Sequence, residues 1–448
     1  MNGTLTAFAL GSGITEYVIP DEVTRIGRST FDGYTLLQSV IIPEGVTEIR
    51  SNAFRGCNNL VGAVIPNSVT AIGENAFAGC SNLLRINIPE GVSEIKAGTF
   101  RGCSSIQEVT IPRSVDYIWD GAFSGCHNLR EFSGAFVSED GYSVIVNGSL
   151  KAFAVNCGVV DYSIPNSVTK IGEDAFDGCT TLQSIVMTDS VTEIKDGAFR
   201  NCTELLSIVI PDSVIKMGDQ VLNGCSKLES VTISKGLKKI DKNILFGCNS
   251  LKSINGNFAS ADGCALVVDG VLAAYAMGCG ATEYTIPEGV IEIGENVFYG
   301  CNDLQSITIS ESVESIHKNA FANCNNITNF SGKFTSFDGK SIIMDGTLMI
   351  FAPKGLTEYT IQEGVKAIGD EVFYGCAELQ NITIANSVNT IGKSAFEKCS
   401  ALHSITIPEN VATIGDRAFY GTGLVNLEIP ASITTFGLGV FENATRLK

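Results

Sequence analysis

A motif of 23 residues returns along almost the whole chain and reads Ile-Pro-x-x-Val-Thr-x-Ile-Gly-x-x-Ala-Phe-x-Gly-Cys-x-x-Leu-x-x-Ile-x. Its Phe position occurs fifteen times, and Phe fills thirteen of them. A fixed period of this length indicates a solenoid, in which each repeat is one coil that contacts only its neighbours. The repeat therefore overrules the 448-residue length, which alone would suggest about three globular domains.

Each repeat predicts two short extended segments and a turn. Ile86 and Ile88 alternate with polar residues, as a strand with one buried face requires. Pro89 ends this strand, because proline has no N–H for a sheet ladder. A second extended piece is expected at residues 92–95, and a single helical turn at residues 99–100.

The residue two places after the Phe position is predicted to close this turn. It is Gly eleven times and Asn three times, the residue types that best tolerate the left-handed conformation. Lys398 is the exception.

A single coil of 23 residues cannot bury its apolar face, so we expect successive coils to stack and pair their strands in a parallel sheet. Counting the expected strands from Tyr17 to Leu427 gives about 18 coils. The core is then a set of stacked ladders, one for each Phe, Leu, Ile and Cys position.

Three longer segments interrupt the period, and each predicts a β-hairpin. Their β-rich runs surround Asn-Gly or Asp-Gly, the strongest short-range hairpin signal. The inserts lie near residues 132–161, 254–283 and 330–358. They divide one continuous solenoid, residues 1–448, into blocks 1–131, 132–253, 254–329 and 330–448. Because the chain opens within half of a fourth hairpin and stops inside a repeat, we expect the protein to continue beyond both ends.

The motif resembles the treponemal-type, BspA-like class of leucine-rich repeats, and fifteen copies cover nearly the whole chain. The resemblance implies a right-handed, curved solenoid with a parallel sheet on its concave face and single helical turns on its convex side. It also implies secreted or cell-surface proteins, mostly of host-associated bacteria, with roles in adhesion to host proteins. The hairpin inserts resemble segments common in that family. No ligand follows from the resemblance.

Charge and hydropathy exclude two classes of partner. The 30 Lys and Arg residues against 48 Asp and Glu give a formal net charge of −18, which repels phosphate backbones. Nucleic acid is therefore not expected as a partner. No apolar run reaches the roughly 18 to 20 residues of a membrane span, so membrane insertion is not expected either.

Twelve of the fifteen cysteines share one position of the repeat. Zinc needs ligands that converge on one point, whereas this spacing predicts a line of thiols. We interpret the line as a buried ladder of reduced cysteines, and we expect no metal and no cofactor. Cys157, Cys264 and Cys279 lie in the inserts and are the better candidates for exposure.

Catalysis is not expected, because the three histidines, His127, His317 and His403, occupy different repeat positions in distant coils. A linear stack does not bring such residues into a triad.

The outward face of the sheet is the candidate binding surface. From the second block onward, two outward positions of the strands carry short polar residues. At the first position we select Ser184, Ser207, Ser230, Ser253, Ser306, Asn381 and Ser404, and at the second Thr232, Thr308, Thr383 and Thr406. Such residues suit any exposed sheet, but an extended concave face is also what solenoids use to hold partners. Both interpretations remain open.

Two irregularities add possible anchors. Trp119 replaces the usual Gly after the Ile position, where it either packs against the next coil or contacts a partner. Lys238 and Lys239 belong to a cluster of lysines in an otherwise acidic chain, which is either a solvated face or a docking patch for an anionic partner.

Together these observations predict a noncatalytic, extracellular or cell-surface protein that resembles adhesins and recognises host protein or glycan through the solenoid surface. We expect a monomer. A structural spacer that displays another region is the alternative, and an enzyme is the third possibility.

Overall fold

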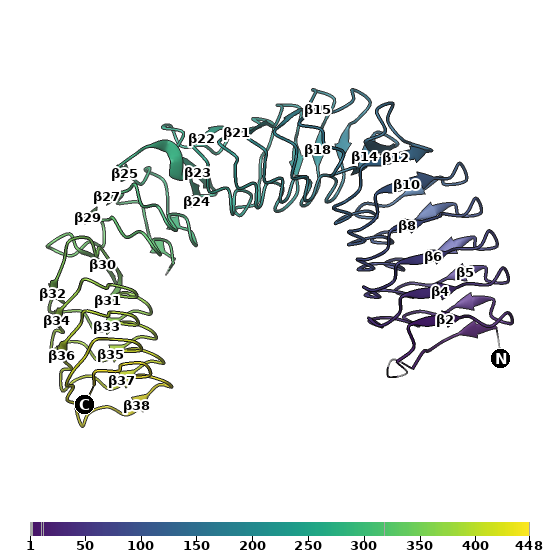
Figure 1. Cartoon of the computed structure of the whole chain (residues 1–448). Coiled ribbons are helices and arrows are strands. Elements are labelled where there is room, and N and C mark those ends of the chain that lie inside the picture. The colour runs from purple at the N-terminus through teal and green to yellow at the C-terminus, as the bar shows by residue number, and fades with distance from the viewer. Residues whose placement is uncertain (1–2, 10, 12, 318, 448) are drawn as a thin grey trace. The chain divides into compact units, whose positions relative to one another are not determined.

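The computed structural model describes residues 3–9, 11, 13–317 and 319–447. Contacts divide the chain into two units, Met1–Cys264 and Ala265–Lys448, and each is described by itself. Within each unit the chain winds into stacked coils whose regular elements are almost all short strands (Figure 1). The predicted β-rich solenoid of stacked parallel strands is confirmed.

The strand that follows the Leu position pairs in parallel with its equivalent 23 residues away, as in Val40 with Ala63. We call these strands the first ladder. In the first unit they are β2 (Glu16–Val18), β4 (Ser39–Ile41), β6 (Gly62–Val64), β8 (Arg85–Ile86), β10 (Glu108–Ile111), β12 (Glu131–Gly134), β15 (Asp161–Ser163), β17 (Ser184–Val186), β19 (Ser207–Val209), β21 (Ser230–Ile233) and β22 (Ser253–Gly256). In the second unit they are β25 (Glu283–Thr285), β27 (Ser306–Ile309), β29 (Asn329–Gly332), β32 (Glu358–Thr360), β34 (Asn381–Thr383) and β36 (Ser404–Thr406).

The second extended piece of each repeat forms a second parallel ladder, as in Ile49 with Ile72. In the first unit this ladder holds β1 (Thr4–Leu5), β3 (Arg25–Ile26), β5 (Glu48–Ile49), β7 (Ala71–Ile72), β9 (Glu94–Ile95), β11 (Tyr117–Ile118), β14 (Ser149–Phe153), β16 (Lys170–Ile171), β18 (Glu193–Ile194) and β20 (Lys216–Met217). In the second unit it holds β24 (Val271–Tyr275), β26 (Glu292–Ile293), β28 (Ser315–Ile316), β31 (Thr347–Phe351), β33 (Ala367–Ile368), β35 (Thr390–Ile391), β37 (Thr413–Ile414) and β38 (Thr435–Phe436).

The three inserts are hairpins, as predicted. Their first strands are β13 (Ser143–Val146), β23 (Ala265–Val268) and β30 (Ser341–Met344), which pair antiparallel with β14, β24 and β31. The second strand of each hairpin also joins the second ladder in parallel. Each hairpin thereby supplies a residue at the Phe position, and the rings of Phe351 and Phe373 lie 4.7 Å apart.

The turn around the Phe position is a run of tight turns rather than the expected helical turn. In the repeat of Phe77, both Asn75 and Gly79 adopt the left-handed conformation, with φ of 53° and 75°. Left-handed residues on both sides of the Phe position interrupt a right-handed helix. Lys398 also adopts this conformation, with φ of 63°. In the described part of the chain the one helix is η1 (Met277–Cys279), and no helix there is long and apolar enough to cross a membrane.

These turns carry a third set of hydrogen bonds between coils. The Phe54 N–H donates to the carbonyl of Ala76 at 2.8 Å, and the Gly56 N–H donates to that of Ala78 at 2.7 Å. We call the segment that runs from two residues before each Phe position to two residues after it the turn ridge. Because backbone groups bond to the next coil on all three sides, few of them are left for the solvent.

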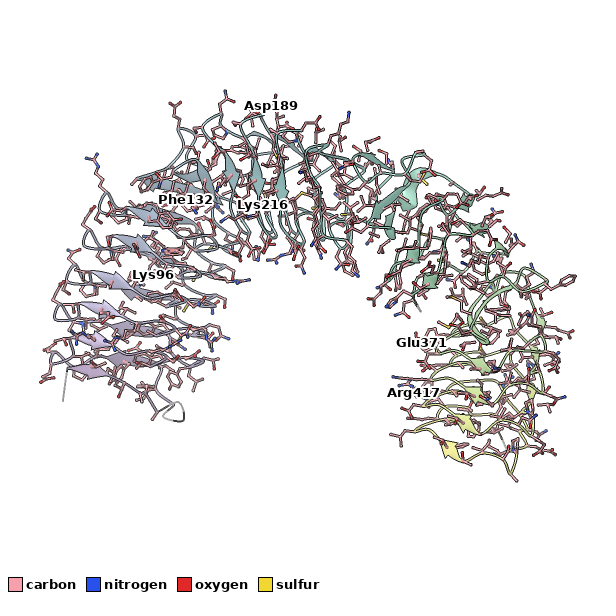
Figure 2. All side chains as sticks on the ribbon, turned by 180° about the vertical axis from the view of Figure 1, so that it is seen from behind. Lys96, Phe132, Asp189, Lys216, Glu371 and Arg417 are labelled. Carbon is pink, nitrogen blue, oxygen red and sulfur yellow. The ribbon has the colours of Figure 1, made fainter. Side chains whose placement is uncertain are left out.

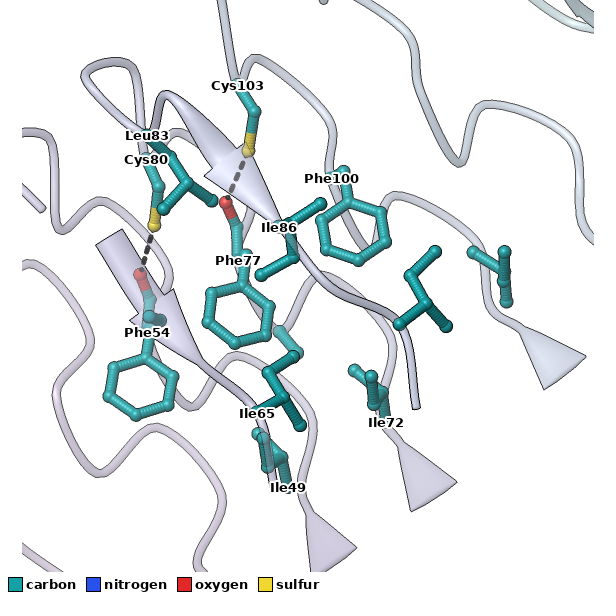
Figure 3. Close-up of a cluster of buried hydrophobic side chains, with 14 of the residues drawn as sticks. Ile49, Phe54, Ile65, Ile72, Phe77, Cys80, Leu83, Ile86, Phe100 and Cys103 are labelled. Carbon is teal, nitrogen blue, oxygen red and sulfur yellow. Dashed lines mark hydrogen bonds between the residues drawn. The ribbon is translucent and has the colours of Figure 1, made fainter. Parts of the chain in front are cut away.

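The core consists of the stacked ladders that the repeat predicts (Figure 3). The rings of Phe31 and Phe54 lie 5.0 Å apart and are tilted by 4°, and those of Phe54 and Phe77 lie 5.2 Å apart. The second unit repeats this arrangement, with 5.0 Å between Phe373 and Phe396.

Two expected strands are missing, since the residues around Ile240 form no strand of the second ladder and those around Leu427 form no strand of the first ladder. The turn before Leu427 is one residue shorter than in the preceding repeat, with Gly421-Thr422-Gly423 in place of Lys398-Cys399-Ser400-Ala401. The Val425 N–H still donates to the carbonyl of His403 at 3.1 Å, so the segment enters the ladder in register but forms no strand beyond that bond.

The aromatic stack predicts a stability cost for removing one rung. Phe77 is fully buried between the rings of Phe54 and Phe100. We expect Phe77→Ala to lower the free energy of unfolding by about 3 to 5 kcal/mol, because it leaves a cavity that rigid coils cannot close. Urea unfolding followed by circular dichroism measures the loss. Phe337→Ala is the control, since that side chain is fully exposed, and an equal loss in both variants would contradict the prediction.

Candidate ligand-binding surface

The predicted polar residues form two columns on the outward side of the first ladder. Ser184, Ser207, Ser230 and Ser253 are direct neighbours across four strands of the first unit. Each is exposed or half-buried, while the residue that follows it in the strand is buried, as Val231 is after Ser230. We call the column of these serines the first outward column and the column two residues later the second outward column.

The second unit continues the same columns within its own strands. Asn381 pairs with Ser404 in the first outward column, and Thr383 pairs with Thr406 in the second. All four side chains are exposed. Ser306 and Thr308 lie in β27 at the same positions and are half-buried, as Thr232 is in the first unit.

Neighbouring polar side chains in these columns bond to one another. The Ser184 hydroxyl donates to Asp161 at 2.6 Å, and the hydroxyls of Thr308 and Ser331 lie 2.8 Å apart. These bonds hold the side chains in a fixed spacing set by the strands. A ligand that follows the ladder therefore meets a regular row of oxygen atoms.

The outward columns are not polar throughout, because apolar side chains also occupy them. Val186 and Val209 occupy the second outward column and are 56% and 58% exposed. In the first block, Val18, Ile41 and Val64 form an exposed apolar row in direct register. The signal was present in the sequence as valine and isoleucine at a strand position that faces outward.

The two possible anchors are both exposed. Trp119 is 48% exposed and lies edge-on to Tyr117, with 5.5 Å between ring centroids. Lys238 and Lys239 are exposed and form no ion pair with the described residues. Other lysines of the same cluster bond to acidic residues one coil earlier, as Lys227 does to Glu204 at 2.6 Å.

The cysteine ladder is buried, as predicted. The thiol of Cys80 donates to the carbonyl of Phe54, and that of Cys103 to the carbonyl of Phe77, both at 3.1 Å (Figure 3). Burial raises the pKa of Cys57 to about 12 and that of Cys179 to about 11. The structure has thiols and no disulfides at the described cysteines, and it holds no group of three or more His, Cys, Asp or Glu placed to bind a metal ion there.

The profile of the "BspA type Leucine rich repeat region" matches residues 5–130, 149–261, 273–341 and 349–448. Its gaps fall at the hairpin inserts, and the matched ranges include most of the chain. The chain belongs to the BspA-type leucine-rich repeat family.

Several solved structures are similar to this BspA-type protein. A leucine-rich repeat protein from Bacteroides ovatus is 25% identical, with 100% of this chain and 88% of that chain covered and a TM-score of 0.30. A leucine rich cell surface protein from Faecalibacterium prausnitzii is 23% identical, with coverages of 99% and 89% and a TM-score of 0.32. The pneumococcal vaccine antigen PcpA is 18% identical, with coverages of 78% and 88% and a TM-score of 0.40. A comparison with curated proteins finds no match.

The BspA-type repeats of the first unit enclose a cluster of charges at the first hairpin. Lys151 is buried in β14, and its ammonium bonds to Asp120 at 2.8 Å, while Lys195 bonds to the other oxygen of Asp120 at 2.5 Å. Burial disfavours the Asp120 carboxylate, but the two lysines outweigh it and hold its pKa below the usual range. Nearby, the buried carboxylate of Asp174 accepts a hydrogen bond from Ser124 at 2.9 Å.

The burial of the thiols predicts their reactivity. With Ellman's reagent at pH 8, the native protein should react at no more than three cysteines, the half-buried Cys157, Cys264 and Cys279. The ladder thiols are shielded, and their raised pKa leaves little thiolate. The protein in 6 M guanidinium chloride provides the control and should react at all fifteen cysteines. A native count close to the denatured count would contradict the buried ladder.

The charge cluster predicts a second stability effect. We expect Asp120→Ala to lower the free energy of unfolding by about 3 to 5 kcal/mol, because it leaves Lys151 buried without its carboxylate. Lys195→Ala is the matched control. Lys195 is partly exposed and its loss leaves the Asp120–Lys151 pair intact, so about 1 kcal/mol or less is expected. Urea unfolding compares the two variants, and an equal cost would show that the burial of Lys151 does not decide the effect.

Proposed function

We propose that this BspA-type protein is a noncatalytic binding protein, secreted or held at a cell surface, that recognises a protein or a glycan with the outward columns of its first ladder. The observation that carries the proposal is the register of these columns. Ser207 and Ser230, for example, are paired neighbours in a rigid parallel sheet. A surface that is ordered before binding loses little entropy when a ligand arrives.

The scaffold supports binding rather than chemistry. A solenoid coil contacts the coils beside it, so acids and bases meet mainly as ion pairs between neighbouring coils, such as Lys227 with Glu204 at 2.6 Å and Lys252 with Glu229 at 2.7 Å. An extended surface of this kind suits a partner that spans several coils.

The proposed location follows from the family resemblance. One of the solved structures similar in fold is described as a cell surface protein and another as a vaccine antigen. An adhesin-like role in contact with host molecules is part of the proposal for this chain.

A double variant tests the outward columns. Ser230→Arg with Ser306→Arg places one long charged side chain on the columns of each unit. We expect the variant to lose at least tenfold in affinity for the ligand that the unaltered protein selects from arrays of immobilised extracellular-matrix proteins and glycans. Its unfolding midpoint should stay unchanged, because both substitutions replace side chains at the surface.

Asn249→Arg with Ser400→Arg is the matched control, since these residues lie after the Cys position of their coils, away from the first ladder. The control should bind like the unaltered protein. Equal binding by all three proteins would contradict recognition by the columns. No binding by any of them would favour the structural spacer instead.

A further inference from the structure

The third hairpin shortens one corner of its coil by two residues. In the following coil, four residues separate Ile368 of the second ladder from Phe373. In the hairpin coil only two residues, Met349 and Ile350, separate Leu348 from Phe351. Leu348 pairs with Ile368, and the rings of Phe351 and Phe373 are in contact, so both ends of the corner keep their register. The two missing residues therefore leave a gap in the turn ridge.

The gap is a cleft of about 250 Å³ within the second unit. Met349 and Phe351 form part of its lining from the hairpin side. The coils on either side contribute two tyrosines, several amides and two carboxylates. Those used below are Tyr299, Tyr374, Asn296, Asn319, Asp370 and Glu371.

The same corner of the first hairpin is occupied by charged side chains. Lys151 stands where the third hairpin has Met349, and it bonds to Asp120. Asp174 is buried against Ser124 there, whereas the equivalent Glu371 is exposed at the third hairpin (Figure 2). Ala322 replaces Ser124 and offers no hydroxyl. The open cleft is thus a property of the third insert and not of every hairpin in this chain.

The side chains of the cleft match the two kinds of surface on a sugar ring. Tyr299 and Tyr374 are 52% and 41% exposed, and the face of a tyrosine attracts the C–H edge of a pyranose. The amides of Asn296 and Asn319 can donate to and accept from hydroxyls, while Asp370 and Glu371 accept from them. We propose that the third-hairpin cleft is a subsite for a neutral glycan. The inference rests on the proposed function as a binding protein and adds a second binding place, in the turn ridge, with its own ligand class.

Two features narrow the ligand further. Pockets for drug-sized molecules enclose about 300 to 1,000 Å³, so this cleft suits one or two sugar rings at the end or within a longer glycan. The carboxylates of Asp370 and Glu371, in a chain with a net charge of −18, disfavour sialylated and sulfated glycans.

Tyr374 is held in position before any ligand arrives. The ammonium of Lys398 lies 4.9 Å from the centroid of its ring and donates a hydrogen bond to its hydroxyl. An aromatic side chain fixed in this way loses less entropy on binding than a mobile one.

A glycan array with the full chain tests the inference. The array carries neutral hexose and N-acetylhexosamine oligosaccharides beside sialylated and sulfated ones, and a second array carries extracellular-matrix proteins. We expect the unaltered protein to bind neutral glycans and Tyr299→Ala with Tyr374→Ala to lose at least tenfold in affinity. Glu371→Gln keeps the size of the side chain and should weaken binding by a smaller factor. Thermal unfolding verifies that the variants fold.

Tyr420→Ala is the matched control, because Tyr420 occupies the same repeat position as Tyr374 two coils later and does not line the cleft. It should bind like the unaltered protein. Neutral-glycan binding that survives the double tyrosine variant, or binding to anionic glycans alone, would overturn the inference. Binding to matrix proteins without any glycan would overturn it while leaving the proposed function in place. If the unaltered protein bound to neither array, both the glycan subsite and the proposed function would be contradicted.

Discussion

The 23-residue register between coils is the constraint on which the rest of the structure depends. A single coil leaves most of its backbone N–H and C=O groups without partners, and unpaired buried groups are costly. The next coil supplies those partners only when every position faces its equivalent. Ile49 then meets Ile72, and the thiol of Cys80 reaches the carbonyl of Phe54. Hydrogen bonding and core packing are thus satisfied by the same alignment.

The side chains at each repeat position could be predicted from the sequence better than the backbone hydrogen bonds between coils. The Phe and Cys ladders and the left-handed residue after each Phe position follow from spacing and residue type. The turn ridge does not, because the period shows that Phe54 and Phe77 are equivalent but not which backbone amide bonds across to Ala76. Lys398 illustrates the limit, since position in the repeat forces its φ to 63° although its residue type does not favour it.

One part of the candidate binding surface could likewise be predicted from the sequence, and another part could not. The outward columns could be predicted, because alternation along a strand decides which side chains face out. The cleft at the third hairpin could not, since it depends on how Leu348 and Phe351 keep their register across a shortened corner. The first hairpin has the same length between these positions, and its corner holds Lys151 and Asp120 instead. A difference of a few side chains therefore decides between a stabilising cluster and an open site.

The equivalence of the coils has a consequence for how such a gene changes. Loss or gain of one whole repeat by recombination places the same Phe, Cys and Ile positions beside each other at the new junction, whereas an event out of phase shifts every position at once. We expect the regular blocks to vary in length among related strains. The coils beside the first hairpin lack this freedom, because the ion pairs of Asp120 with Lys151 and Lys195 join coils that run from β11 to β18. Those coils must be inherited together.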